Sequence, residues 1–255
     1  MTLPPGIPID DNQAIGLIPA RGGSKSIPLK NLAPIAGRPM IAYVMAAGLQ
    51  AATLSRVYCS TDHPAIAQVC REGGVEVLDR PAHLGEDDTP VVAVVRQVLE
   101  AVAQRDGRMP GMVALLQPTS PFLLAEHIDA CVEALRGQPA ADSAQTITPV
   151  FHNAHAFNQR VVEEGLVRFR FQEERAAAYN KQRKPKHYLF GNLVVTRSRA
   201  IFAGKDCFGG VSVPVEIPRL YALDVDTAED LDYASYLVNS GKVLLPGQPS
   251  ATCRC

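Results

Sequence analysis

The stretch that decides the fold is residues 14–31, which read AIGLIPARGGSKSIPLKN. Its first part, Ala14–Pro19, is an unbroken apolar run of the length of one buried strand. The glycine pair Gly22-Gly23 follows at once, with Arg21, Lys25 and Lys30 around it. Glycines let backbone amides approach a ligand closely, and three cations suit the charge of a triphosphate.

The loop after this strand matches neither of two common phosphate-binding patterns. It has no GK[ST] that opens a helix, and it has no GxGxxG. By itself it is as consistent with a basic surface turn as with a ligand site. Because open α/β sheets bind ligands at the carboxyl ends of their strands, its position favours phosphate binding.

Outward from this stretch, apolar strand-like runs alternate with helical patterns as far as about residue 142. This alternation predicts an α/β fold, with a mostly parallel sheet flanked by helices. The expected strands are 14–19, 55–61, 75–78, 112–117, 143–150, 193–196 and 211–215, and the expected helices are 39–53, 64–72, 89–104, 124–136 and 227–239. Prolines are expected in the first turns of the helices at 39–53 and 89–104.

The pattern changes between residues 150 and 190. Val161–Phe171 alternates apolar and polar residues around Glu164-Gly165, which predicts a β-hairpin, and residues 172–187 are polar and basic. We therefore predict one domain over residues 14–241 with an insertion at about 150–190, which is expected to serve dimerisation. Residues 1–13 are expected to be a disordered segment and residues 242–255 a tail.

Composition excludes several classes of protein. With 25 basic and 26 acidic side chains, the net charge of −1 argues against a general nucleic-acid or membrane-surface binder. No apolar run approaches the roughly 20 residues of a membrane span, and the first residues lack the features of a secretory signal. The six scattered cysteines are typical of free thiols in a cytosolic protein. We expect a cytoplasmic protein with no nucleic-acid or membrane partner.

A second candidate site is Asp224-Val225-Asp226-Thr227. In an extended segment the carboxylates of Asp224 and Asp226 point to the same face, about 7 Å apart. Beside a triphosphate-binding loop, such a pair can hold Mg²⁺ and its phosphate oxygens. A local interpretation is also open, in which Thr227 and Asp230 form a capping box at the start of the last helix. The two interpretations are compatible, because the cap uses only one of these groups.

A third candidate is Leu116-Gln117-Pro118-Thr119-Ser120-Pro121, where a central strand ends in a turn between two prolines. The Gln117 side chain can donate and accept hydrogen bonds, which suits a polyhydroxylated ligand. In isolation the segment is better explained as a proline-bounded turn.

Three further polar clusters have simpler explanations. Glu86-Asp87-Asp88 is expected to be a solvated cap of the helix that follows it. The six histidines show no metal-ligand spacing, although His155 and His187 are placed to reach an acceptor pocket from the insertion. The basic run Lys181–Lys186 lacks the interleaved aromatic residues of a nucleic-acid site, and an acidic sugar explains it as well.

Five blocks, IPARGGSK-x-IPLKN, STD, RP-x-x-L, LQPTSP and DVDT, occur in this order and spacing. Together they resemble the CMP-sialic acid synthetases, also called acylneuraminate cytidylyltransferases, from about Ile15 to Leu237. The resemblance implies a Rossmann-like α/β fold that uses CTP and Mg²⁺, usually as a homodimer. It also implies the reaction, in which the C2 hydroxyl of an acidic nine-carbon sugar attacks the α-phosphorus of CTP and pyrophosphate leaves.

Carried over position by position, the resemblance implies distinct sets of site residues. The nucleotide would be bound by the first loop and by one later arginine, namely Ala20, Arg21, Gly22, Ser24, Lys30, Asn31 and Arg80. The acid sugar would be bound by Gln117, Thr119, Ser120, Lys181, Gln182 and Phe208. Asp224 and Asp226 would hold Mg²⁺, and one of them would help to deprotonate the nucleophile. The catalytic groups would be Arg21, Lys25, Lys30 and Asp226, since phosphoryl transfer depends on positioning and on neutralising developing charge.

The sequence departs from the family pattern mostly on the acceptor side. Ser26 replaces a glycine of the first loop, which is tolerated if its φ is negative. Lys181 replaces an arginine and so loses the bidentate fork, and Gly191-Asn192-Leu193 replaces Asn-Gly-Ala. Phe208-Gly209 stands where the family has two aromatic residues that reach the partner subunit, and His152–His155 lacks a family lysine.

These observations leave three hypotheses. The first is a Mg²⁺-dependent cytidylyltransferase that activates a sialic-acid-like nonulosonic acid. The second keeps the fold and changes the acceptor to legionaminic acid, pseudaminic acid or a phosphonate, with GTP as an alternative nucleotide. The third is a catalytically silent nucleotide-binding homologue, which the full set of loop cations and both aspartates disfavours, because clustered like charges are costly to keep.

Overall fold

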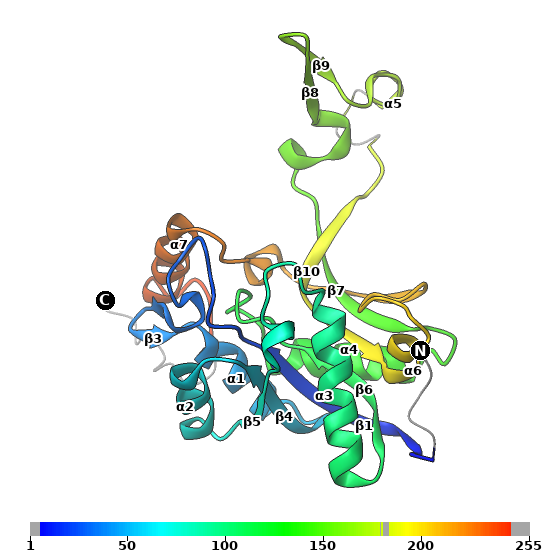
Figure 1. Cartoon of the computed structure of the whole chain (residues 1–255). Coiled ribbons are helices and arrows are strands. Elements are labelled where there is room, and N and C mark those ends of the chain that lie inside the picture. Colours follow the sequence, from blue (N-terminus) through cyan, green and yellow to red (C-terminus); the bar gives the residue numbers. More distant parts are fainter. Residues whose placement is uncertain (1–5, 179, 181–183, 246–255) are drawn as a thin grey trace.

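A computed structural model describes residues 6–178, 180 and 184–245 of the chain. Its centre is a seven-stranded sheet with the strand order β11-β7-β10-β6-β1-β4-β5 (Figure 1). The sheet strands are β1 Ile9–Pro19, β4 Leu54–Thr61, β5 Glu76–Asp79, β6 Met109–Leu115, β7 Ser143–Pro149, β10 Tyr188–Arg197 and β11 Ser212–Glu216. Two small hairpins are formed by β2 Pro34–Ile35 with β3 Arg38–Pro39 and by β8 Arg160–Glu163 with β9 Leu166–Phe169. The helices are α1 Ile41–Gln50, α2 Pro64–Glu72, α3 Val91–Asp106, α4 Ala125–Arg136, α5 Gln172–Ala177, α6 Ser198–Phe202 and α7 Ala228–Asn239.

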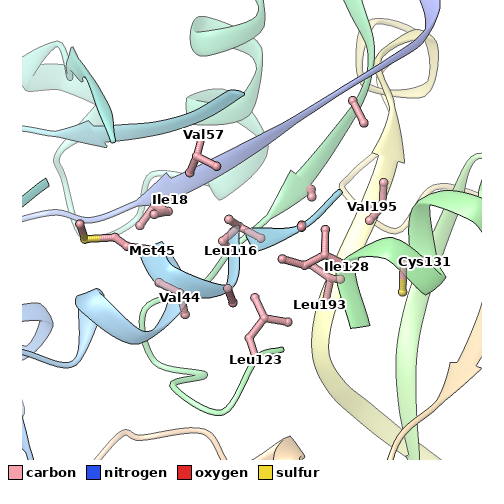
Figure 2. Packing of buried hydrophobic residues seen from close by; sticks show 14 of the residues in the cluster. Ile18, Val44, Met45, Val57, Leu116, Leu123, Ile128, Cys131, Leu193 and Val195 are labelled. Atoms are coloured by element: carbon pink, nitrogen blue, oxygen red, sulfur yellow. The ribbon is translucent and has the colours of Figure 1, made fainter. Parts of the chain in front are cut away.

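Helices cover both faces of the sheet because its central strands are apolar on both sides. Side chains alternate between the faces of a strand, and in β1 Ile15 and Leu17 pack in the cluster that contains α3. Ile18, on the opposite face, packs in the cluster that contains α1 and α4 (Figure 2). Both sets are fully buried. The expected α/β class with a mostly parallel sheet is therefore confirmed.

One strand of the described sheet, β10, is antiparallel to both of its neighbours, β6 and β7. The insertion explains this direction. The chain leaves the sheet at the end of β7 and returns to the same end, so the returning strand must run backwards beside β7. Tyr188 accordingly pairs with Pro149 at the foot of the insertion. The pairing makes β10 longer than the predicted 193–196 segment.

The insertion projects from the body as an arm that carries β8, β9 and α5 (Figure 1). The predicted hairpin is confirmed, and Glu164 and Gly165 form its turn with φ values of 53° and 77°. Its outer surface is apolar, since Val162 is 72% exposed and Val167 is 68% exposed. The short helix α5 was not predicted, because its sequence is polar all round and shows no apolar face.

Several predicted boundaries need correction. Strand β1 begins at Ile9, inside the segment expected to precede the domain, because Ile9 pairs in parallel with Met109. Helix α1 begins at Ile41, and Pro39 belongs to β3 rather than to the first helical turn. Among the described residues, no helix is long and apolar enough to span a membrane.

Candidate active site

A cavity of about 610 Å³ opens where β1, β5 and β6 end. Arg21 and Lys30 line it from the loop after β1, Arg80 from just beyond β5, and Gln117 from just beyond β6. The predicted phosphate-binding loop therefore lies at the carboxyl edge of the sheet, together with the other blocks that the sequence singled out.

The glycine pair is explained by space. Neither Gly22 nor Gly23 has a positive φ. A β-carbon on Gly22 would lie 2.6 Å from the ring of His63, whereas one on Gly23 would meet nothing within 4 Å. The backbone N–H of Gly22 donates to Oδ1 of Asp62 at 2.8 Å. Asp62 and His63 thus fix the loop, and Gly23 leaves its inner side open.

Two further hydrogen bonds hold the first loop, one within the loop and one to strand β4. The Asn31 side chain donates to the carbonyl of Arg21 at 2.9 Å, and the N–H of Ala20, which is buried, donates to the carbonyl of Ser60 at 3.0 Å. Ser24 lines the cavity. Ser26 has no positive φ, so the condition for replacing the family glycine is met.

Two loop cations share one carboxylate across the mouth of the cavity. Arg21 Nη1 and Lys25 Nζ each lie 2.5 Å from an oxygen of Asp87, one from Oδ1 and the other from Oδ2. These contacts hold the pKa of Asp87 below its ordinary value, with Lys25 contributing most and Arg21 next. The expectation that Glu86-Asp87-Asp88 caps the next helix is wrong, because α3 begins at Val91 with no acidic residue in its first turn and no side-chain cap.

Neither of the predicted aspartates lines the cavity directly, but each contacts a residue that does. Lys30 Nζ lies 3.1 Å from Oδ1 of Asp226, and the Lys30 side chain is only 15% exposed. The hydroxyl of Thr119 hydrogen-bonds to Asp224. Desolvation raises the pKa of Asp224, as does the charge of Asp226, against the opposing effect of that hydrogen bond.

The sequence between the aspartates explains how they are placed. Val225 is fully buried against the cluster of α7, and its N–H donates to the carbonyl of Thr119 at 2.8 Å. The Asp224–Asp226 segment is therefore joined to the turn after β6. The predicted capping box of Thr227 and Asp230 is confirmed at the start of α7.

Arg80 forms the back of the cavity. It is 8% exposed, and its guanidinium donates to the hydroxyl of Ser60 at 3.3 Å and to the Ser60 carbonyl at 2.8 Å. Burial lowers the pKa of Arg80, and the nearby carboxylate of Asp62 opposes this effect.

The residues expected to bind the acceptor are only partly gathered here. Gln117 and Thr119 line the cavity, whereas Ser120 is buried and its N–H donates to the carbonyl of Gln117. Lys181 and Gln182 lie outside the described residues. Phe208 does not line the cavity and instead packs edge-on against Phe190 at 5.4 Å.

Two departures from the family pattern have structural reasons. Gly209 has a φ of 69°, and a β-carbon there would lie 2.3 Å from the side chain of Asp142, so an aromatic residue does not fit. Gly191 packs against Thr146 in the same way, with only 2.5 Å to its hydroxyl.

The histidines of the insertion lie elsewhere. His155 and His187 stack at 4.3 Å, and they line a separate cavity of about 230 Å³ at the foot of the arm. Within this chain they do not reach the cavity beside the first loop.

Sequence reasoning missed three residues of the site. Asp62 belongs to the STD block but had been given no role, and His63 limits the space beside Gly22. Asp87 had been placed in a helix cap. The acidic run that contains Asp87 begins six residues after Arg80, but no signal within the run separates Asp87 from its neighbours.

The aspartate pair suits a magnesium ion that is shared with a substrate. No cluster of three or more histidine, cysteine or acidic residues able to hold a metal occurs in the described ranges. Magnesium usually binds through one or two carboxylates together with substrate phosphates and water, and Asp224 and Asp226 supply carboxylates of this kind.

Comparison with known proteins adds independent findings. The profile of the family described as Cytidylyltransferase matches residues 15–206. The chain is similar to the N-acylneuraminate cytidylyltransferase A of Danio rerio, with 34% identity over 149 residues, which is 58% of this chain and 32% of that protein. It is also similar to the CMP-N,N'-diacetyllegionaminic acid synthase of Legionella pneumophila, with 28% identity over 218 residues, which is 85% of this chain and 92% of that protein.

Solved structures show the same fold. CMP:2-keto-3-deoxy-manno-octonic acid synthetase complexed with CTP superposes with a TM-score of 0.68 at 19% identity, over 90% of this chain and 99% of that one. This chain spans most of the Legionella pneumophila relative but only about a third of the Danio rerio one, and it spans about half of other curated relatives.

Proposed function

Because this chain belongs to the cytidylyltransferase family, we propose that it transfers the cytidylyl group of CTP to a hydroxyl of a sialic-acid-like nonulosonic acid. One observation carries the proposal. A single cavity is lined by the loop cations Arg21, Lys25 and Lys30 and by Gln117, and Asp226 lies 3.1 Å from Lys30.

The first loop is proposed to bind the triphosphate. Arg21 and Lys25 stand at the mouth and Lys30 stands deeper, so the three cations can follow a chain of phosphates. Ser24 would contribute its hydroxyl and Arg80 would contact the base or ribose. The N–H groups of Ala20 and Gly22 already donate to Ser60 and Asp62, so these two residues would act by shaping the loop. The low exposure of Lys30 matters, because charge is neutralised more strongly where water is excluded.

In the proposed reaction, the acceptor oxygen forms a bond to the α-phosphorus while the bond from that phosphorus to the bridging oxygen breaks. Pyrophosphate leaves, and one of the two carboxylates, Asp224 or Asp226, takes the proton of the acceptor hydroxyl. Lys30 neutralises the charge that develops on the phosphoryl oxygens. Mg²⁺ bound to Asp224 and Asp226 would supply further charge neutralisation at the phosphates. Gln117 and Thr119 are proposed to orient the acceptor through hydrogen bonds.

The acceptor is proposed at the level of a class. Relatives named for N-acylneuraminate and for diacetyllegionaminic acid both support a nonulosonic acid. Within that class legionaminic acid is a specific second candidate, because the relative named for it is matched over most of its length.

We further propose that the chain acts as a homodimer in the cytoplasm. The exposed apolar side chains of the arm, Val162, Leu166 and Val167, support an interface, and Phe208 would then serve the acceptor site of the partner. The buried free thiols Cys59, Cys70, Cys131 and Cys207 fit a reducing compartment.

The test is pyrophosphate release with CTP, GTP, ATP and UTP and Mg²⁺, against a panel of nonulosonic acids with an octulosonic acid as a control. We expect release with CTP and with at least one nine-carbon acid. Release only with the octulosonic acid, or only with another nucleotide, would contradict the proposal. Binding of CTP with no release from any acceptor would support the silent homologue.

A further inference from the structure

Asp87 is the one carboxylate in the described structure that contacts two cations of the first loop. Its two oxygens are used separately, Oδ1 by Arg21 and Oδ2 by Lys25, at 2.5 Å each. It comes from the segment between β5 and α3, which follows Arg80 and forms the wall of the cavity opposite the first loop. The two ion pairs therefore bridge the mouth of the cavity.

The bridge has no evident purpose in stabilising the fold. Arg21, Lys25 and Asp87 have side chains that are 34%, 85% and 46% exposed. Ion pairs this accessible to water contribute little to stability. Asp87 also caps no helix, as described above. The contacts of the Asp87 carboxylate are with two cations. A carboxylate and a phosphate present their oxygens to arginine in the same way.

We propose that Asp87 is a displaceable counter-ion that occupies the position of the substrate's phosphates and must leave the cations when a polyphosphate binds. The proposal rests on the function proposed above, because it takes the first loop to be the triphosphate site. A triphosphate would bring several negative charges to the position of the Asp87 carboxylate. Arg21 and Lys25 cannot bind the triphosphate and Asp87 at the same time. The segment that carries Asp87 would then swing away from the loop when CTP enters.

Two consequences follow. In the empty site Asp87 holds two cations in place and offsets one of their two charges, at the cost of affinity, because every polyphosphate must compete with Asp87. Pyrophosphate competes with the same carboxylate as it leaves, so Asp87 favours release of the product.

The experiment compares Asp87→Asn with the wild type by titration calorimetry, using CTP and inorganic pyrophosphate without an acceptor, with and without Mg²⁺. Removing a competing carboxylate that makes two exposed ion pairs should lower Kd for both ligands by about three- to tenfold. In steady state, the inhibition constant of pyrophosphate should fall by the same factor.

A matched control is available one residue away. Asp88 is exposed and makes no ion pair within the described part of the chain. Asp88→Asn changes the net charge equally, so it reports the effect of general electrostatics. We expect a change in Kd of less than about twofold for Asp88→Asn, and Asp87→Glu, which keeps the carboxylate, should stay close to the wild type.

The outcomes separate the hypotheses. Weaker binding of CTP by Asp87→Asn, or equal effects of Asp87→Asn and Asp88→Asn, would overturn the counter-ion role. Weaker binding that appears only with Mg²⁺ would make Asp87 a metal ligand instead. Tighter pyrophosphate binding without any CTP binding would support the counter-ion while refuting the proposed function, and binding of neither ligand to any variant would refute both.

Discussion

Lys30 should matter far more than Lys25, although both are cations of the same loop. The perturbation is Lys30→Met compared with Lys25→Met, since methionine keeps the aliphatic stem and removes the charge. The Lys30 side chain is 15% exposed, whereas that of Lys25 is 85% exposed. The difference in exposure, and not in charge, is what the comparison measures.

The expected magnitude follows from Coulomb's law. A unit charge about 4 Å from a phosphoryl oxygen interacts by roughly 4 kcal/mol at the effective dielectric constant of a partly buried site. Since about 1.4 kcal/mol corresponds to a tenfold change in rate, and solvent screens part of the interaction, Lys30→Met should lower kcat/KM for CTP by about 10²–10³. The Lys25 side chain is mostly exposed to water, so Lys25→Met should lower kcat/KM for CTP by less than about tenfold.

The assay is pyrophosphate release with the acceptor that the panel identifies, at varied CTP concentration. Thermal unfolding of both variants controls for loss of structure, because Lys30→Met also leaves Asp226 without its ion pair. If Lys25→Met were as damaging as Lys30→Met, the reasoning from burial would be refuted, even if both residues contact CTP.

Three further predictions rest on single features. Gly22→Ala should weaken CTP binding by about tenfold or more, because the added β-carbon would push the loop away from His63. Gly23→Ala should bind CTP normally in the same calorimetric titration, because its β-carbon would meet no atom within 4 Å. Equal effects of the two substitutions would refute this steric explanation. Burial lowers the pKa of His127, so the unfolded chain takes up the proton first as the pH falls. The free energy of unfolding should therefore decrease below about pH 6.5. Urea unfolding between pH 7.5 and 5.5 measures this decrease, which should be smaller in His127→Gln. Val167→Asp on the arm should shift the chain from dimer to monomer in light scattering. Its Tm should change little, because this side chain is 68% exposed in the single chain. A dimer that is unchanged by the substitution would place the interface elsewhere.

Much of the site was predictable because local patterns determine it. The apolar run before Arg21 predicts a buried strand, and the alternation in Asp224-Val225-Asp226 predicts two carboxylates on one face; in the structure Val225 between them is buried. The capping box of α7 was equally local. Such features depend on residues within four or five positions of one another.

The features that could not be predicted from the sequence depend on contacts between residues far apart in the chain. Asp87 and Arg21 are 66 positions apart, and nothing near Asp87 distinguishes an ion-paired carboxylate from a helix cap. The direction of β10 depends on where the chain re-enters the sheet, and its local composition is the same for either direction. Phe208 was assigned by resemblance, and its place beside Phe190 shows that a matched position need not serve its own chain's cavity.

The Lys30–Asp226 pair also has a consequence for biosynthesis. Its two residues are 196 positions apart, and Asp226 follows Val225, which packs in a cluster that joins α7 to β2, α1 and the turn after β6. At about 5–20 residues per second, a ribosome needs roughly 10–40 s between Lys30 and Asp226. The basic loop of a nascent chain is therefore synthesised long before Asp224 and Asp226. Chains that have not reached Asp226 would at most bind phosphates, and the capacity to react would arise only after Asp226 has been synthesised.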